Sequence, residues 1–124
     1  MKPYALICAT LIAADQLLKR TLPTPYWGWH EKDYTVTSTM MAVVICLILV
    51  SYVPVRIAGT LLLAGLAGNT ISASRGPVAN PFVVGDLAFN SADIMLYAGF
   101  AAIVACFPAV AHDIRKRATA RGWK

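Results

Sequence analysis

Two aspartates stand in or next to apolar stretches of the sequence, where a charged side chain is unusual. Asp15 lies near the end of the first stretch, and Asp93 lies at the beginning of the last. An ionisable side chain at membrane depth costs roughly 2.5 kcal/mol or more, so such residues are rare and mark candidate functional sites. A carboxylate can take up or release a proton during catalysis. Whether these two aspartates mark such a site depends on whether the stretches around them cross a membrane.

The composition indicates an integral membrane protein. Hydrophobic residues make up 58% of the 124 residues and charged residues only 14%, and the mean hydropathy is +0.62. A soluble domain contains about 25% charged residues, so this chain has too few to cover a surface in water. The length predicts a single membrane domain over residues 1–124.

Four apolar stretches are candidate spans, at about residues 3–20, 39–55, 56–72 and 90–111. Each is close to the roughly 20 residues that a spanning helix needs, and a single span in lipid must be helical. The predicted fold class is therefore all-α integral membrane, a four-transmembrane-helix bundle with a small extracytoplasmic loop region. Pro108 lies in the last turns of the fourth stretch and predicts a kink there.

Basic residues predict how the bundle is oriented. Lys2 precedes the first span, Arg56 follows the second, and a basic tail at 112–124 follows the fourth. Because cytoplasmic loops carry the excess of Lys and Arg, we expect both termini in the cytoplasm. The segments 21–39 and 72–91 then lie together on the outer side of the membrane.

The basic tail also allows a second interpretation. Clustered Lys and Arg residues could bind anionic lipid or nucleic acid. We favour the orientation signal, which accounts for most of the net charge of +5. Membrane lipids are therefore expected as partners, and nucleic acid is not.

No metal and no organic cofactor is predicted. Cys8, Cys46 and Cys106 are isolated in apolar stretches and have no paired spacing. His30 has no second histidine at ligand spacing. The three cysteines are interpreted as small core residues.

Small residues recur at four-residue spacing in the third and fourth spans. The rows are Ala64 with Gly68, Ala98 with Ala102, and Ala101 with Ala105. Such rows let helix backbones approach closely in lipid. They could dock another helix or pack inside the bundle, and internal packing is the interpretation that we favour.

Four short polar motifs follow one another along nearly the whole chain. They are Asp15-Gln16-Leu17-Leu18-Lys19, Gly68-Asn69, Gly76-Pro77-Val78-Ala79-Asn80 and Phe89-Asn90-Ser91-Ala92-Asp93. Together they resemble the patterns D-Q-x-x-K, G-N-x-x-D-R, G-x-V-x-D and F-N-x-A-D of the lipoprotein signal peptidases (signal peptidase II). The resemblance implies a four-span protein of the bacterial cytoplasmic (inner) membrane. Members of that family use an aspartate pair to cut the signal helix from lipid-modified prolipoproteins.

Departures from the family pattern concern the catalytic groups. The resemblance places the aspartate pair at Asn80 and Asp93, so the first catalytic position is an asparagine here. Asp86 is a candidate replacement carboxylate, although a solvated loop charge is the simpler interpretation. The resemblance implies supporting roles for Asp15, Lys19, Asn69, Arg75 and Asn90. The third motif departs as well, because its D-R falls on Ser72 and Ala73 and Arg75 matches only after a shift of two.

Two functions remain open at this point. The first is a signal peptidase II-like aspartic endopeptidase that cleaves the signal helices of prolipoproteins, using Asp93 with Asp86 or with a tolerated Asn80. The second is a catalytically impaired homologue that binds a transmembrane helix or serves as a small membrane subunit of a larger complex. An amide can donate a hydrogen bond to a carbonyl but cannot shuttle a proton, and general acid–base catalysis is worth about 10²–10⁴-fold. Both hypotheses expect one outer cluster made by Asp15, Lys19, Asn69, Asn90 and Asp93.

Overall fold

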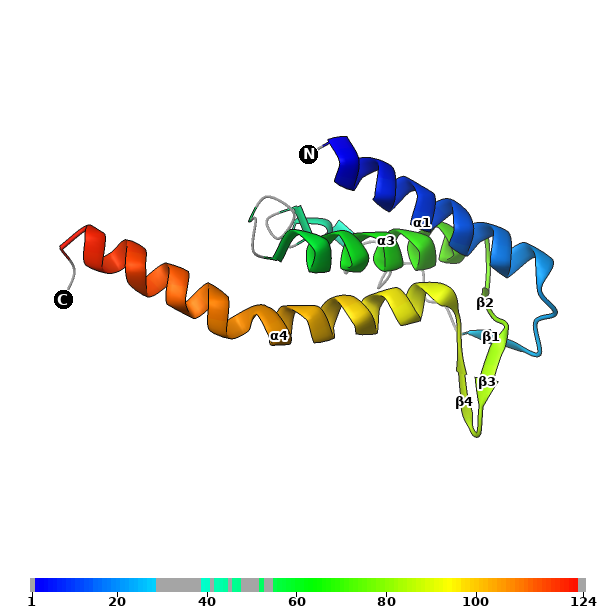
Figure 1. Ribbon diagram of the computed structural model, residues 1–124. Helices are drawn as coiled ribbons and strands as arrows, with labels where there is room; N and C mark the ends of the chain where they lie inside the picture. Colours follow the sequence, from blue (N-terminus) through cyan, green and yellow to red (C-terminus); the bar gives the residue numbers. More distant parts are fainter. Residues whose placement is uncertain are drawn as a thin grey trace.

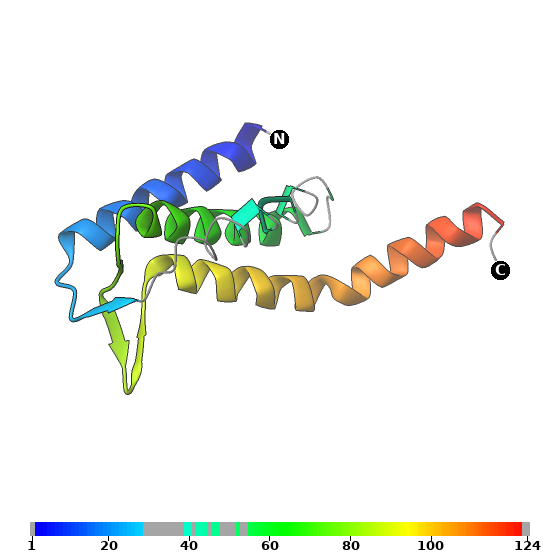
Figure 2. The ribbon, with the colours of Figure 1, turned by 180° about the vertical axis from the view of Figure 1, so that it is seen from behind.

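Three long helices lie side by side in the computed structural model. They are α1 (Lys2–Thr21), α3 (Arg56–Ala73) and α4 (Ser91–Ala120). Helix α3 lies between the other two, in the front view and in the view from behind (Figures 1 and 2). The residues that the structure describes are 2–28, 39–40, 42–44, 46–47, 52 and 55–122.

Much of the second predicted span, residues 39–55, lies outside the described residues. The described parts at 42–44 and 46–47 are helical. His30 also lies outside the described residues. The four-span arrangement therefore stays a prediction, and what the structure establishes is a mostly helical protein.

Small residues set the close packing of α3 against its neighbours. Ala64 is fully buried, and an added Cβ at Gly65 would lie 2.5 Å from the carbonyl oxygen of Ala92 in α4. Cys8 and Met95 complete the buried core around these residues. For α3, the internal packing that the small-residue spacing predicts is confirmed.

Helix α4 does not pack through the alanine rows that its sequence suggests. Its residues Ala98, Ala101 and Ala105 are exposed. Positions three to four apart share a helix face, and the face that α4 turns towards α3 carries Met95 and Gly99 instead. Three of the four alanines in these rows therefore do not pack within the described part of the chain, whereas Ala102, three positions after Gly99, is half-buried.

Helix α4 is also longer than the fourth predicted span. It continues past residue 111 to Ala120, so most of the basic segment 112–124 is helical. Pro108 lies inside the helix, and the ribbon of α4 bends along its length (Figure 1). A proline removes one backbone hydrogen bond and its ring crowds the preceding turn, which explains a bend. Among the described residues, α4 is the one helix that is long and apolar enough to cross a membrane.

Short strands occupy the predicted loop region at one end of the helices. Strand β1 (Tyr26–Gly28) pairs antiparallel with β2 (Val78–Asn80), and β3 (Phe82–Val84) pairs with β4 (Leu87–Phe89). The β1–β2 pair joins the two segments that were expected to lie together on the outer side. The β3–β4 hairpin projects away from the helices (Figure 1). The loop region thus contains β-structure, which an all-α class leaves out.

Candidate functional site

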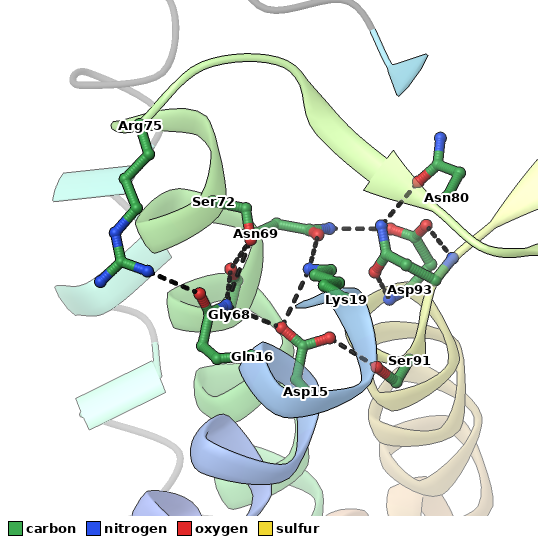
Figure 3. Close-up of polar contacts among 11 residues, drawn as sticks. Asp15, Gln16, Lys19, Gly68, Asn69, Ser72, Arg75, Asn80, Ser91 and Asp93 are labelled. Carbon is green, nitrogen blue, oxygen red and sulfur yellow. Dashed lines mark hydrogen bonds and ion pairs between the residues drawn. The ribbon is translucent and has the colours of Figure 1, made fainter. Parts of the chain in front are cut away.

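Three helix ends bring polar side chains to one place. The last turns of α1 and α3 and the first turn of α4 lie at the same end of the molecule (Figures 1 and 3). The residues joined there by hydrogen bonds are called the polar network below. They are Asp15, Gln16, Lys19, Gly68, Asn69, Ser72, Arg75, Asn80, Asn90, Ser91 and Asp93.

Asp15 is the buried centre of the polar network. Its Oδ2 accepts hydrogen bonds from Lys19 Nζ at 2.9 Å and from Gln16 Nε2 at 3.0 Å. Its Oδ1 accepts a hydrogen bond from Ser91 Oγ at 2.6 Å. The Lys19 side chain is only 5% exposed, so Asp15 and Lys19 form a buried ion pair. Removing two charges from water costs several kcal/mol each, and the ion pair with its added hydrogen bonds offsets that cost.

Gly68 makes room for the Asp15 carboxylate between α1 and α3. A Cβ at position 68 would lie 2.6 Å from Asp15 Oδ2. The carboxylate is held by Lys19, Gln16 and Ser91, so it cannot move aside without breaking these bonds. The glycine of the Gly68-Asn69 motif is therefore explained by the close approach of two helices.

Lys19 and Asn69 connect the two aspartates. Lys19 Nζ donates a second hydrogen bond to Asn69 Oδ1 at 2.9 Å. Asn69 Nδ2 in turn donates to Asp93 Oδ1 at 2.8 Å. Asp15 and Asp93 thus belong to one network, with an ammonium group and an amide between their carboxylates (Figure 3).

Asn90 and Asp93 form a capping box at the beginning of α4. Asn90 Oδ1 accepts a hydrogen bond from the backbone N–H of Asp93, and Asp93 Oδ2 accepts one from the backbone N–H of Asn90, both at 3.1 Å. This reciprocal pair satisfies backbone N–H groups that have no partner inside the helix. Asp93 therefore has a structural role in addition to any chemical one.

Asn80 joins the polar network through Asn90. Its Oδ1 accepts a hydrogen bond from Asn90 Nδ2 at 2.8 Å. Within the described part of the chain, Asn80 Nδ2 donates no hydrogen bond, and it points away from the network (Figure 3). Asn80 is the last residue of β2 and pairs with Tyr26 in β1. The two positions of the expected catalytic pair, Asn80 and Asp93, are thus linked by a single side chain.

Gln16 ties α1 to α3 on the other side of Asp15. Its Nε2 lies 3.0 Å from the Gly68 carbonyl oxygen and 3.1 Å from Ser72 Oγ, and both accept from it. Its Oε1 accepts a hydrogen bond from Arg75 Nη1 at 3.4 Å. Arg75 therefore reaches the network through Gln16, and its supporting role stays a prediction.

Asp86 is not brought to the polar network. It lies with Gly85 in the exposed turn between β3 and β4, on the hairpin that points away from the helices (Figure 1). Within the described residues it makes no hydrogen bond or ion pair with the network. The geometry therefore does not support Asp86 as the replacement for a missing carboxylate.

The sequence gives no indication of one important contact, that of Ser91. Its hydroxyl makes the shortest hydrogen bond to Asp15, across 76 positions of the sequence. Such a contact depends on how α1 and α4 cross, and no local pattern encodes it. The capping box of Asn90 and Asp93 can be found in the sequence, because an asparagine followed three residues later by an acidic residue is typical of a helix start.

Among the described residues, the arrangement supplies hydrogen-bond donors around the Asp93 carboxylate, and no second carboxylate is hydrogen-bonded to it. Proton sharing needs two carboxylates in contact. Next to Asp93, the polar groups are the amide of Asn69 and the backbone N–H of Asn90. Among the described residues, no group of three or more His, Cys, Asp or Glu could hold a metal ion. The site can therefore orient a carbonyl group or accept a proton, and the described residues form no pair of carboxylates that provides acid and base together.

Comparison with solved structures identifies the class of fold. Two structures, each described as a bacterial membrane enzyme studied by the in meso method, match this chain with TM-scores of 0.64 and 0.61. The first match covers 86% of this chain and 93% of the other, the second covers 90% and 92%, and both have 18% sequence identity. Comparison of the sequence with known protein families and with curated proteins gave no match. The chain thus has the fold of these bacterial membrane enzymes, and its apolar helix α4 is consistent with a place in a membrane.

Proposed function

We propose that this protein is a signal peptidase II-like membrane protein that binds the signal helix of a lipid-modified prolipoprotein without cleaving it. It is then a divergent, catalytically impaired homologue in the bacterial cytoplasmic membrane, with four spans and both termini in the cytoplasm. The fold shared with bacterial membrane enzymes supports the proposal. So does the fact that all four sequence motifs contribute residues to the polar network.

The observation that carries the proposal is the surroundings of Asp93. Both of its carboxylate oxygens accept hydrogen bonds, one from Asn69 and one from the backbone of Asn90. Among the described residues, no other carboxylate is hydrogen-bonded to Asp93. The position that would complete the pair is Asn80, and the carboxylate of Asp15 is held in its ion pair with Lys19.

The consequence for catalysis follows from acid–base chemistry. In an aspartic peptidase, one carboxylate removes a proton from water while its protonated partner polarises the scissile carbonyl. The amide of Asn80 can orient the carbonyl, but it cannot return a proton to the leaving group. Loss of one acid–base partner costs about 10²–10⁴-fold in rate, so wild-type cleavage is expected to be negligible.

The binding part of the proposal rests on apolar surface next to the polar network. A hollow of about 530 Å³ is lined by Leu22, Pro23, Thr24, Pro25, Pro81 and Phe82. Its residue Pro81 directly follows Asn80. Val84 and Leu87 near the tip of the β3–β4 hairpin are 66% and 71% exposed. Exposed apolar surface of this kind suits an apolar partner, such as a signal helix together with the acyl chains of the lipid-modified precursor.

An active peptidase is the alternative function. It would use Asp93 as the base and Asn80 to orient the carbonyl, and the link between them through Asn90 favours it. Asp86 would take no part, because it lies in the exposed hairpin turn.

Binding and cleavage can be separated in one assay. A photo-crosslinking residue replaces Phe82 in the full-length protein, which is reconstituted in vesicles with a lipid-modified prolipoprotein. The same precursor without its lipid modification, and an unrelated transmembrane helix, serve as controls. We expect a crosslink to the modified precursor and no shortened product on a gel. Equal crosslinking to the unrelated helix would contradict specific binding, and a shortened product from the wild type would favour the peptidase.

A further inference from the structure

A second polar surface lies on α4, at the end of the helix opposite the polar network. Five exposed residues line a shallow, open surface there, and we call them the basic face: His112, Arg115, Lys116, Thr119 and Ala120. Their spacing of three and four positions places them on one side of the helix. The resemblance of the chain to other proteins assigns no role to this surface.

The basic face begins where α4 would leave the hydrocarbon core of a membrane. A rise of 1.5 Å per residue puts His112 roughly 30 Å along the helix from Ser91, which is about the thickness of the hydrocarbon core. Helix α4 is long and apolar enough to cross that core. With the polar network at one membrane boundary, the basic face lies among the lipid headgroups of the other.

The acidic residue in the same segment as the basic face is engaged elsewhere. Asp113 is the one acidic residue of the segment 112–124. Its Oδ2 accepts a hydrogen bond from the Tyr52 hydroxyl at 2.8 Å and pairs with Arg117 Nε at 2.9 Å. Arg115 and Lys116 form no ion pair within the described residues. Both positive charges are therefore available to an anion.

We propose that the basic face binds the phosphate group of an anionic phospholipid headgroup. The guanidinium of Arg115 can bond two phosphate oxygens at once, Lys116 adds a second positive charge, and the small side chain of Ala120 leaves space. The Thr119 hydroxyl already donates to the backbone carbonyl of Arg115, so the two charged side chains carry the interaction. An orientation signal depends only on how many charges lie on one side, whereas this site depends on which face of the helix they occupy.

Lipid retention by the full-length protein tests the proposal. The purified protein is equilibrated in detergent with equal amounts of phosphatidylglycerol and phosphatidylcholine, and the retained lipids are counted by native mass spectrometry. Wild type should retain phosphatidylglycerol preferentially. Arg115→Gln and Lys116→Gln should each reduce that preference roughly five-fold, as expected for one basic residue at an anionic surface. Arg115→Lys keeps the charge and should keep most of the preference.

Arg121→Gln is the matched control. It removes one positive charge from the same end of α4 but from a position outside the basic face, and it should leave the preference unchanged. An equal loss in Arg121→Gln and Arg115→Gln would overturn the site, because only total charge would then matter. No preference in the wild type would overturn it as well. Inorganic phosphate or RNA can be added at the same concentration as phosphatidylglycerol. If either displaces the lipid, the basic face binds a soluble anion, which would also contradict the proposal.

Discussion

Lys19 and Asp15 stabilise the polar network only as a pair. Both are buried between the helices, with Asp15 fully enclosed. Each charge offsets the desolvation of the other, so the removal of one leaves its partner as an unpaired buried charge. Such a loss is far more destabilising than the loss of an exposed ion pair.

Replacing Lys19 by methionine should therefore lower the free energy of unfolding by roughly 3–5 kcal/mol. The change keeps the length of the side chain and removes its charge. Arg20→Met is the matched control, because Arg20 is the exposed neighbour in the same helix and should change the stability by no more than about 0.5 kcal/mol. Unfolding in detergent, followed by circular dichroism, measures both variants. Equal losses would contradict the buried pair.

Part of this residue-level arrangement can be predicted from the sequence. Asp15 and Lys19 are four positions apart on a helix and must lie on one face. The cap between Asn90 and Asp93 follows from their spacing at a helix start. The contact of Ser91 with Asp15 cannot be predicted in this way, because it depends on how two helices cross.

Helices α3 and α4 approach each other closely at two glycines, one from each helix. A Cβ at Gly65 would lie 2.5 Å from the carbonyl oxygen of Ala92, and one at Gly99 would lie 2.8 Å from Cγ of Leu62. The Ala92 carbonyl oxygen is a backbone atom, so it cannot move aside by a side-chain rotation. Gly65 therefore sets how closely α3 and α4 approach, and with that the place of Asp93 relative to Asn69.

Gly65→Ala should destabilise the protein by about 1–3 kcal/mol, the usual cost of overpacking. The physical reason is that α3 and α4 must move apart to admit one methyl group. Ala101→Leu is a stringent control, because it adds more volume at an exposed position of α4 and should have little effect. Thermal unfolding of both variants in the same detergent gives the comparison. A Gly65→Ala protein as stable as wild type would refute the close contact.

The elements themselves are predictable to different degrees. The first and third predicted spans coincide closely with α1 and α3 because long apolar stretches are a strong signal. The strands could not be predicted, since each has three residues and such segments carry no clear periodicity. The fourth predicted span ends at residue 111, and α4 continues beyond it to Ala120, because Lys and Arg are good helix formers.

The whole molecule has its polar network at one end of α4 and its basic face at the other. If α4 crosses the membrane, the β3–β4 hairpin and the C-terminus must lie on opposite sides. The positive-inside rule predicts that the C-terminus lies in the cytoplasm. Proton-transfer or helix-binding chemistry would then take place at the outer surface.

Labelling of single cysteines tests this topology. In a background without Cys8, Cys46 and Cys106, one cysteine replaces Asp86 in the hairpin turn and another is added after Lys124. A membrane-impermeant maleimide should label the first in intact cells and the second only after permeabilisation. Labelling of both from the same side would show that α4 does not span the membrane.

Asn80→Asp tests most directly the proposal that the polar network is a peptidase site in which one carboxylate is replaced by an amide. An aspartate at position 80 can keep the bond from Asn90, because Oδ1 is the accepting atom. Its second carboxylate oxygen takes the place of Nδ2, which donates no hydrogen bond among the described residues. The variant should gain prolipoprotein cleavage of about 10²–10⁴-fold over wild type in a gel-shift assay in lipid vesicles. Adding Asp93→Asn should abolish that gain, whereas adding Asp86→Asn should leave it intact. Cleavage by the wild type at the level of Asn80→Asp, or no cleavage by Asn80→Asp in a correctly folded protein, would contradict the account.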